Sequence, residues 1–468
     1  MHSHCKHMVD KWLEQDFSQL AGQAFERLKS FVESLTALKL TRFFLVSFLV
    51  LFPFQIRTLV FQMPFTPTGN FNEYTAFFLH LSDLALVATF LAFGVALYKG
   101  EVKEIHYGSW PVTLSLLLFL GLIMASIPLS AFPVVGFWKF LRFLEFFGLY
   151  LLLVNQILSR RQVLLFFIGG MLFQSFLAFL QYLFQSSIGL HFLGEVHLSP
   201  QELGVAKVDF NGGKYLRAYG TFSHPNVLGG LVAMALLWSY ALFRKRMIPF
   251  LGIGAFLIVG LLLSFSRSAF LAIGGGVLFF ISLTDKKIRF QNVLLWGSVV
   301  LFLIVLFNLQ DVLFDRLFLG NDPNATVERL EYLDAGKRML MAYPFGTGLG
   351  HFTLMMQDFM VQSADPWLLQ PVHNVVLLIM NEAGIITGAV FVGLFCVLFV
   401  QLLRGLKTKN DDEKAFASIA IAILGVIALI MLFDHYFFTI YAGQAALFLY
   451  LGVVSDSFNK DLLPRKKS

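Results

Sequence analysis

The chain has 468 residues, of which 57% are apolar and only 14% are charged, and its mean hydropathy is +0.73. Soluble domains carry about 25% charged residues, so the composition excludes an ordinary soluble protein. Apolar stretches of about 18–25 residues recur along the chain, each long enough to cross a bilayer as a helix, and the alternating pattern of a β-barrel is absent. We therefore expect an all-α polytopic membrane protein.

Residues 1–40 are expected to form a cytoplasmic amphipathic segment, because apolar side chains recur there at helical spacing with Lys and Glu between them. A helix lying on the inner membrane face and a solvated helix packed on the protein are the two alternatives. No cleavable signal peptide is evident. The two cysteines, Cys5 and Cys396, imply no disulfide framework.

Twelve membrane spans are predicted. Nine form a membrane bundle within residues 41–308, a polar loop follows at 309–372, and three more lie in 373–468 together with a cytoplasmic tail. If the N-terminus is inside, every inner segment carries Lys or Arg, as the positive-inside rule expects. Both termini are therefore predicted to be cytoplasmic, with the loops at about 188–219 and 309–372 outside. The spans are placed at 41–61, 75–98, 110–131, 134–157, 162–187, 220–243, 247–265, 268–284, 291–308, 373–400, 414–434 and 436–455.

Charged residues interrupt two of these spans. Asp83 lies in the second, and Lys139, Arg142 and Glu145 repeat every three residues along the fourth. A charge at mid-helix costs about 2.5–3.5 kcal/mol on insertion scales, so each needs a partner or a wet cavity. One interpretation is an ion-pair network such as Asp83 with Arg142, and the other is a site for a lipid headgroup.

The stretch YLRAYGTFSHPNVLGG (215–230) leads into the sixth predicted span. Arg217 lies at the outer boundary, and His224 and Asn226 flank Pro225 at the helix start. Pro is tolerated in a first helical turn, and the free N–H groups there favour an anion. The alternative is a capped helix start with an arginine that reaches to the membrane surface.

Arg267, in SFSRSAF (264–270), interrupts about 36 otherwise apolar residues, a length that needs two helices in a bilayer. The order of the spans puts this break at the outer surface. Its planar guanidinium suits a phosphate or diphosphate. The alternative is an interface anchor, although the usual outer anchors are aromatic.

The long outer loop contains eight acids and four bases, so anion binding there depends on particular arginines. Arg329, Tyr332, Gly336 and Leu340 recur at helical spacing and predict a helix lying across the bundle. The following FGTGLGHF (345–352) predicts a glycine-rich turn. It is not a nucleotide loop, because no strand precedes it.

His373 opens the tenth predicted span at the outer surface, with Asn374 beside it and Glu382 further along. A neutral imidazole could accept the proton of a sugar hydroxyl as that oxygen attacks. The alternative is a polar residue satisfied at a helix end. The arginines and His373 all fall on one side of the membrane, which favours a shared site.

At these residues the chain resembles the O-antigen ligase/polymerase family. The similarity runs through GTFSHPN, SRSA, ERLEYLDAGKRMLMAYPFGTGLGHF and HNVVLLIMNEAGIITG in that order, over about residues 200–400. The resemblance implies a GT-C-like bundle of about 12 helices in the bacterial inner membrane, with a large periplasmic loop between spans 9 and 10. Such enzymes move a glycan from undecaprenyl diphosphate to an acceptor on the outer face, with inversion and without a metal or other cofactor.

The resemblance also implies roles for single residues. Arg267 and Arg329 look like the diphosphate-binding arginines, Arg217 like a further basic contact, and His373 like the base. The expected partners are the lipid-linked donor, a saccharide acceptor (lipid A-core or a growing glycan) and the bilayer, with no nucleic acid. The residues expected to support the site are Asn374, Asn226, His224 and Glu382.

Several functions fit this interpretation of the sequence. Ligation is favoured, while polymerisation of glycan repeats and glycosylation of a protein use the same machinery. A lipid-linked glycan flippase or secondary transporter is the alternative from another class. Transporters of that kind usually show two similar halves, and no duplication is visible here.

Overall fold

The computed structural model describes residues 36–63, 71–202, 204–210, 213–283, 323–361, 369–408 and 410–455, together with positions 297, 300, 313 and 365. Most of the N-terminal amphipathic segment, nearly all of the predicted span 291–308 and the C-terminal tail lie outside the described residues.

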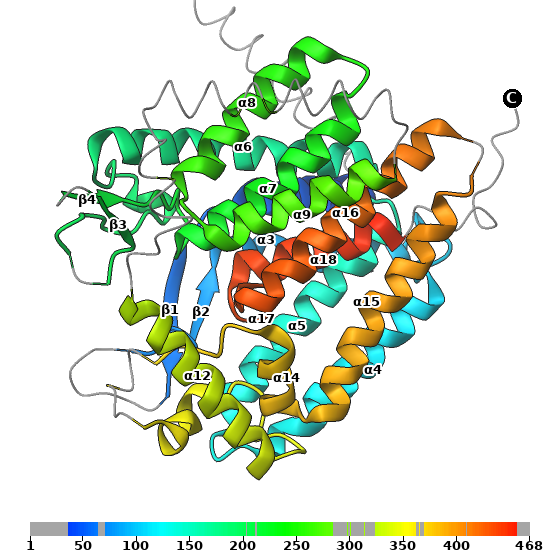
Figure 1. The fold of residues 1–468 in the computed structure, drawn as a ribbon. Helices are drawn as coiled ribbons and strands as arrows, with labels where there is room; N and C mark the ends of the chain where they lie inside the picture. Colours follow the sequence, from blue (N-terminus) through cyan, green and yellow to red (C-terminus); the bar gives the residue numbers. More distant parts are fainter. Residues whose placement is uncertain are drawn as a thin grey trace, which may run out of the picture.

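The described chain is mostly helical and folds as one bundle (Figure 1). Its longer helices are α2 (Ala37–Leu51), α3 (Leu81–Tyr98), α4 (Trp110–Ser126), α5 (Pro133–Val154), α6 (Arg160–Phe184), α7 (Pro225–Phe243), α8 (Met247–Leu263), α9 (Arg267–Ser282), α12 (Pro323–Ala342), α14 (Val375–Ala383), α15 (Ile385–Gly405), α16 (Asp411–Phe433) and α18 (Tyr441–Ser455). Short helical turns are η1 (Ile127–Leu129), η2 (His191–Leu193), α13 (Phe352–Met355), η4 (Met356–Phe359) and α17 (Tyr436–Thr439).

Within the described residues, six helices are long and apolar enough to cross a membrane: α3, α4 with η1, α6, α7, α15 and α16. Shorter apolar helices, among them α9 and α18, pack against them. The prediction of a polytopic helical membrane protein is therefore confirmed. The number of twelve spans stays a prediction.

Two antiparallel hairpins depart from the predicted all-α fold. Strand β1 (Arg57–Gln62) pairs with β2 (Ala76–His80), and β3 (Lys207–Phe210) pairs with β4 (Gly213–Leu216). The predicted span 41–61 is wrong at its end, because α2 stops at Leu51 and Pro53 follows. Proline has no backbone N–H and cannot continue a helix, so the apolar residues after it extend as a strand.

The predicted span 373–400 is two helices. Gly384, between α14 and α15, has φ +91°, a conformation that a residue with a Cβ rarely adopts. A Cβ at Gly384 would also meet the Phe345 carbonyl oxygen at 2.7 Å. The glycine therefore turns the chain and lets the 345–352 loop approach closely.

Asp83, on α3, forms an ion pair with Arg142 of α5. The Arg142 guanidinium lies between the carboxylates of Asp83 and Glu145, with the Glu145 contact at 2.6 Å. Arg142 also donates to the Phe78 carbonyl at 3.0 Å. The predicted pairing of Asp83 with Arg142 is confirmed, and these charges hold α3, α5 and the β1–β2 hairpin together.

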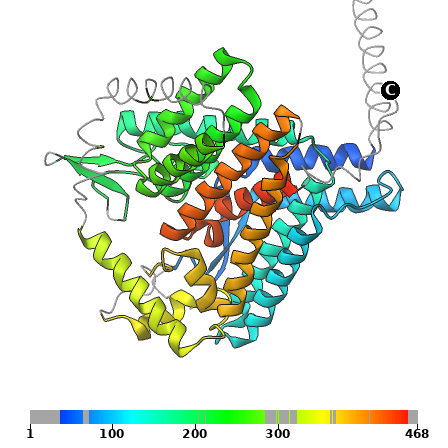
Figure 2. The ribbon, with the colours of Figure 1, turned by 45° about the vertical axis from the view of Figure 1, so that its right-hand side comes forward.

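The predicted helix within the long loop is confirmed as α12, which lies across one end of the bundle (Figures 1 and 2). It packs on α14 and η4 through Tyr332, Ala335 and Met339, all nearly fully buried. We call this the α12 end of the bundle.

Candidate functional site

Helix α7 begins with a side-chain cap. The His224 Nδ1 atom accepts the backbone N–H of Asn226 at 3.1 Å, and Pro225 occupies the first helical position. This cap satisfies one of the N–H groups that a helix start leaves unpaired. The capped-helix interpretation of HPN is confirmed.

Arg217 is held inside the protein rather than at its surface. Its side chain is 5% exposed, its Nε donates to the Ser264 carbonyl at 3.0 Å, and a terminal nitrogen donates to Asn226 Oδ1 at 2.6 Å. Ser264 lies at the break between α8 and α9. The guanidinium therefore ties this break to the start of α7, and its predicted contact with a diphosphate stays a prediction.

Asp434 continues this chain of hydrogen bonds and was missed by sequence reasoning. Its Oδ2 accepts from Asn226 Nδ2 at 2.7 Å, and its Oδ1 accepts the backbone N–H of His435 at 2.8 Å. Both Asp434 and His435 are about 95% buried at the end of α16. The signal that could have found them is an adjacent acid and imidazole directly after an apolar run.

The loop before α14 places His373 against the same group. The His373 and His435 rings meet edge to face with their centroids 5.1 Å apart. His435 Nδ1 is bonded to Thr439 Oγ1 at 2.7 Å, whereas His373 Nδ1 has no hydrogen-bond partner among the described residues. The His373 Nδ1 atom is therefore buried beside His435 and makes no hydrogen bond to the described residues.

Burial keeps these imidazoles neutral. Loss of hydration lowers the pKa of His435 to about 3, and it also lowers the pKa of His373 below its ordinary 6.5. The Asp434 carboxylate opposes the shift of His373, and the Arg329 guanidinium adds to it. At neutral pH, His373 is thus an unprotonated imidazole able to accept a proton.

Arg329 reaches this site from α12. The neighbouring acids are engaged elsewhere, because Glu328 accepts the Tyr332 hydroxyl at 2.6 Å and Glu331 accepts the Val361 N–H at 3.1 Å. Among the described residues, Arg329 itself forms no ion pair or hydrogen bond, and its charge acts on both His373 and His224. It is an exposed cation at the α12 end of the bundle.

The charges of Arg217 and Arg329 both lower the pKa of His224. Desolvation by the surrounding protein, followed by the charges of Arg217 and Arg329, lowers this pKa although the His224 ring keeps access to solvent. Both arginines therefore disfavour protonation of His224.

Arg267 is the first residue of α9, directly after Ser266, whose side chain caps the helix by accepting from Ala269 N. This break packs against Gly229 of α7, where a Cβ would meet Ser264 Oγ at 2.7 Å. The half-buried Arg267 side chain forms no ion pair or hydrogen bond within the described part of the chain. It is not among the charges that shift the pKa of His224 or His373, so the structure brings it to the start of α7 but not against the imidazoles.

Asn374 and Glu382 occupy structural positions on α14. Asn374 caps the helix by accepting from Leu377 N at 2.9 Å. Glu382 is 2% exposed and faces the backbone N–H groups of Gly350 and Phe352, with Lys139 as its electrostatic partner. These contacts fix His373 and the 345–352 loop to one helix.

The glycine-rich turn packs against the α14–α15 break through backbone hydrogen bonds, including Gly348 N to the Glu382 carbonyl at 2.8 Å. Gly348 has φ +104°, and a Cβ there would lie 2.7 Å from the backbone nitrogen of Ser130. The predicted turn is confirmed, and glycine is required at this position by conformation and by space.

We predict that Gly348→Ala destabilises the protein by about 1–3 kcal/mol from backbone strain alone. Gly94→Ala is the matched control, because Gly94 lies inside α3 and an added methyl group would meet nothing within 4 Å. That change should be neutral or stabilising. Thermal unfolding of both variants in detergent tests this, and equal melting temperatures would contradict it.

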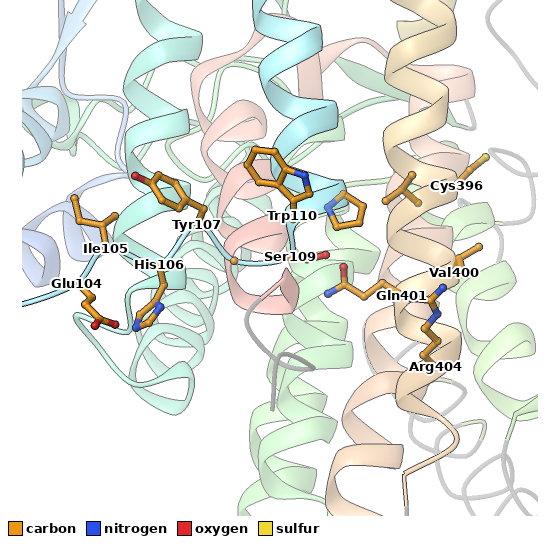
Figure 3. Close-up of a pocket in the computed structure, with 13 residues that line it drawn as sticks. Glu104, Ile105, His106, Tyr107, Ser109, Trp110, Cys396, Val400, Gln401 and Arg404 are labelled. Atoms are coloured by element: carbon orange, nitrogen blue, oxygen red, sulfur yellow. The ribbon is translucent and has the colours of Figure 1, made fainter. Parts of the chain in front are cut away.

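A wide cavity of about 1040 Å³ lies elsewhere, between the start of α4 and the last turns of α15 (Figure 3). Its wall includes His106, Trp110, Gln401 and Arg404. On α15 its lining begins at Cys396, about 17 Å along the helix from Ile385 at 1.5 Å per residue, which separates this cavity from the α12 end. It contains none of the predicted site residues.

Comparison with known families identifies the central part of the chain. Residues 252–392 match the family model described as O-antigen ligase. The matched segment contains Arg267, Arg329 and His373, whereas Arg217, Asn226 and Asp434 lie outside it. No curated protein matches the chain. The matched segment, in a helical protein with membrane-spanning helices, supports the assignment of this chain to the O-antigen ligase family.

Proposed function

We propose that the protein transfers a glycan from undecaprenyl diphosphate to a saccharide acceptor at the outer face of the bacterial inner membrane. The α12 end of the bundle would face outward, both termini would be cytoplasmic, and about twelve spans would form a GT-C-like bundle. Residues 309–372, with α12, would be the lid that excludes water from competing as acceptor.

In this proposal, His373 is the general base. An acceptor hydroxyl oxygen attacks the anomeric carbon of the donor while its proton moves to the imidazole. The bond from that carbon to the diphosphate oxygen breaks on the opposite face, so the configuration inverts. Undecaprenyl diphosphate leaves as an anion, and no metal is required.

The arginines stabilise the charge that grows on the leaving group. Arg329 and Arg267 suit this role because neither is engaged by an acid among the described residues. A guanidinium group binds phosphate oxygens through two parallel N–H···O hydrogen bonds. Arg217 would act differently, as a positioning residue that holds Asn226 and, through it, Asp434.

The observation that supports the proposal is that a cation and a carboxylate both act on His373. The Arg329 guanidinium of α12, which has no partner among the described residues, and the buried Asp434 carboxylate at the end of α16 shift the pKa of this imidazole in opposite directions. A diphosphate leaving group and an attacking hydroxyl need a cation and a base together in this way.

We predict that purified protein, given a defined undecaprenyl-diphosphate glycan and an acceptor, yields an acceptor heavier by the mass of the transferred glycosyl group and releases undecaprenyl diphosphate. Lipid A-core as the productive acceptor identifies a ligase, and a longer lipid-linked glycan identifies a polymerase of the same family. The reaction should continue with chelator present. Absence of product with every acceptor, together with movement of intact donor across a vesicle membrane, would replace this proposal with a flippase.

A further inference from the structure

A second, smaller cavity adjoins the candidate site. It has a volume of about 80 Å³ and is lined by residues of the β1–β2 hairpin, α5, α17 and the start of α18. At roughly 10–15 Å³ for each ordered water, it holds about six waters, and a single sugar ring displaces several. The residues of its wall that matter here are Gln55, Tyr74, Trp138, Lys139 and Thr439.

Two of these wall residues also contact His435, which packs on the candidate base His373. The Tyr74 and His435 rings meet edge to face with their centroids 5.1 Å apart, and Thr439 Oγ1 is hydrogen-bonded to His435 Nδ1 at 2.7 Å. His435 in turn packs on His373. A group bound in the cavity would therefore be separated from His373 by the His435 ring and the side chains packed on it.

The other charges in the wall are already neutralised. Arg57 forms a two-bond ion pair with Glu73, and Arg142 lies between Asp83 and Glu145. Lys139 is the one lining cation without a hydrogen bond or an ion pair within 4.0 Å among the described residues, and Glu382 is its electrostatic partner. This near-neutral wall suits hydroxyl groups better than it suits a diphosphate.

Two side chains in the wall, Gln55 and His80, have buried polar atoms without a hydrogen-bond partner among the described residues. Gln55 is 5% exposed, and its Nε2 has no hydrogen-bond partner among the described residues. A buried donor left unsatisfied carries an uncompensated desolvation penalty, so a ligand oxygen here would recover free energy. Trp138, stacked on Phe77 with centroids 4.5 Å apart, adds an aromatic wall. Few polar groups beside aromatic rings are typical of a small-molecule site.

We propose that this cavity is a saccharide subsite that binds one uncharged pyranose ring of the glycan substrate. Gln55 Nε2 and Lys139 Nζ would donate to ring hydroxyls, and Trp138 would contact the apolar face of the ring. The subsite rests on the proposed glycan transfer, and it adds a residue set outside the matched family segment. The ring belongs to the donor or to the acceptor.

Binding of free monosaccharides tests the subsite without turnover. Full-length protein in detergent is titrated with galactose, glucose and N-acetylglucosamine, and saturation-transfer NMR reports binding. At least one sugar should bind the wild type, and Gln55→Leu and Trp138→Leu should each weaken binding about tenfold. Trp138→Phe should retain most of the binding, because an aromatic wall remains.

Gln401→Leu and Trp110→Leu are the matched controls, since both residues line the distant cavity of Figure 3. They should leave sugar binding unchanged. His373→Ala should also keep it, so a failed transfer assay and a failed subsite are distinguished. In the transfer assay, a tenfold rise in the KM of donor or acceptor for Gln55→Leu identifies which ring is bound.

The proposal is overturned if no sugar binds the wild type at millimolar concentration, or if Gln55→Leu and Trp138→Leu bind as the wild type does. Each variant is first checked for an unchanged melting temperature and a single species in detergent. If Gln55→Leu fails this check, Gln55→Glu takes its place, because glutamate keeps the side-chain shape but removes the two amide donors.

Discussion

Replacing His373 with alanine is expected to lower the rate of glycan transfer by about 10²–10⁴-fold, the usual contribution of a general base. The reason is geometric. His373 Nδ1 is buried without a protein partner among the described residues, beside the His435 ring and under the field of Asp434. The measurement is the initial rate with a defined lipid-linked donor at saturating acceptor.

His351→Ala is the matched control. His351 is also a buried histidine, at the start of α13, but its ring packs on Phe132 and not on the cluster. It should change stability more than the rate of the folded enzyme. Transfer that survives His373→Ala at near wild-type rate would remove His373 from the mechanism.

The dependence of this rate on pH follows from the direction of the pKa shift. A base acts in its unprotonated form, and burial lowers the pKa of His373 below 6.5. A lowered pKa keeps the imidazole unprotonated as the pH falls. The acid limb of kcat/KM should therefore lie below pH 6.5, and a limb above that value would contradict the assignment.

Replacing Arg329 with alanine is expected to have two effects. Transfer should slow by about 10²–10³-fold, as when one donor to a developing anion is removed. The acid limb should also move to higher pH, because the positive charge that helps to lower the pKa of His373 is gone. A merely structural role for Arg329 would change stability without moving the limb.

Two variants bracket this prediction. Arg338→Ala removes an arginine from the same helix that is already paired with Asp334 at 3.1 Å, so it should leave both rate and limb unchanged. Asp434→Asn should move the limb the opposite way from Arg329→Ala, because the carboxylate raises the pKa of His373. Shifts in the same direction for Arg329→Ala and Asp434→Asn would refute the shared electrostatic site.

The helical elements near the site were predictable because their signals are local. The helix that the structure gives as Pro323–Ala342 was predicted from Arg329, Tyr332, Gly336 and Leu340, which lie three or four residues apart. The glycine turn follows from three glycines in five residues. The β1–β2 hairpin was not predicted, since an apolar run interrupted by Pro53 is equally compatible with one span. Its strand pairing joins residues on both sides of a loop and leaves no periodic signal in a short run.

The sequence alone could not show which of the three arginines have hydrogen-bond partners in the folded protein. Arg217, Arg267 and Arg329 look alike in sequence, yet Arg217 is engaged by Ser264 and Asn226 while Arg329 is left without a partner among the described residues. Asp434 joins the site across 208 residues through Asn226. A contact of that separation depends on how helices pack, which no local pattern records.

The sequence by itself determined a helical membrane protein, the break at Arg267, the helix that carries Arg329 and the polar residues His373 and Asn374 before α14. Each depends on hydropathy or on spacing along one element, and both are properties of a short segment. Only the tertiary structure decided that Asp434 and His435 lie beside His373, and that a polar cavity adjoins them. The physical reason is that desolvation and electrostatic partnership arise from the surrounding elements, which meet only in the folded bundle.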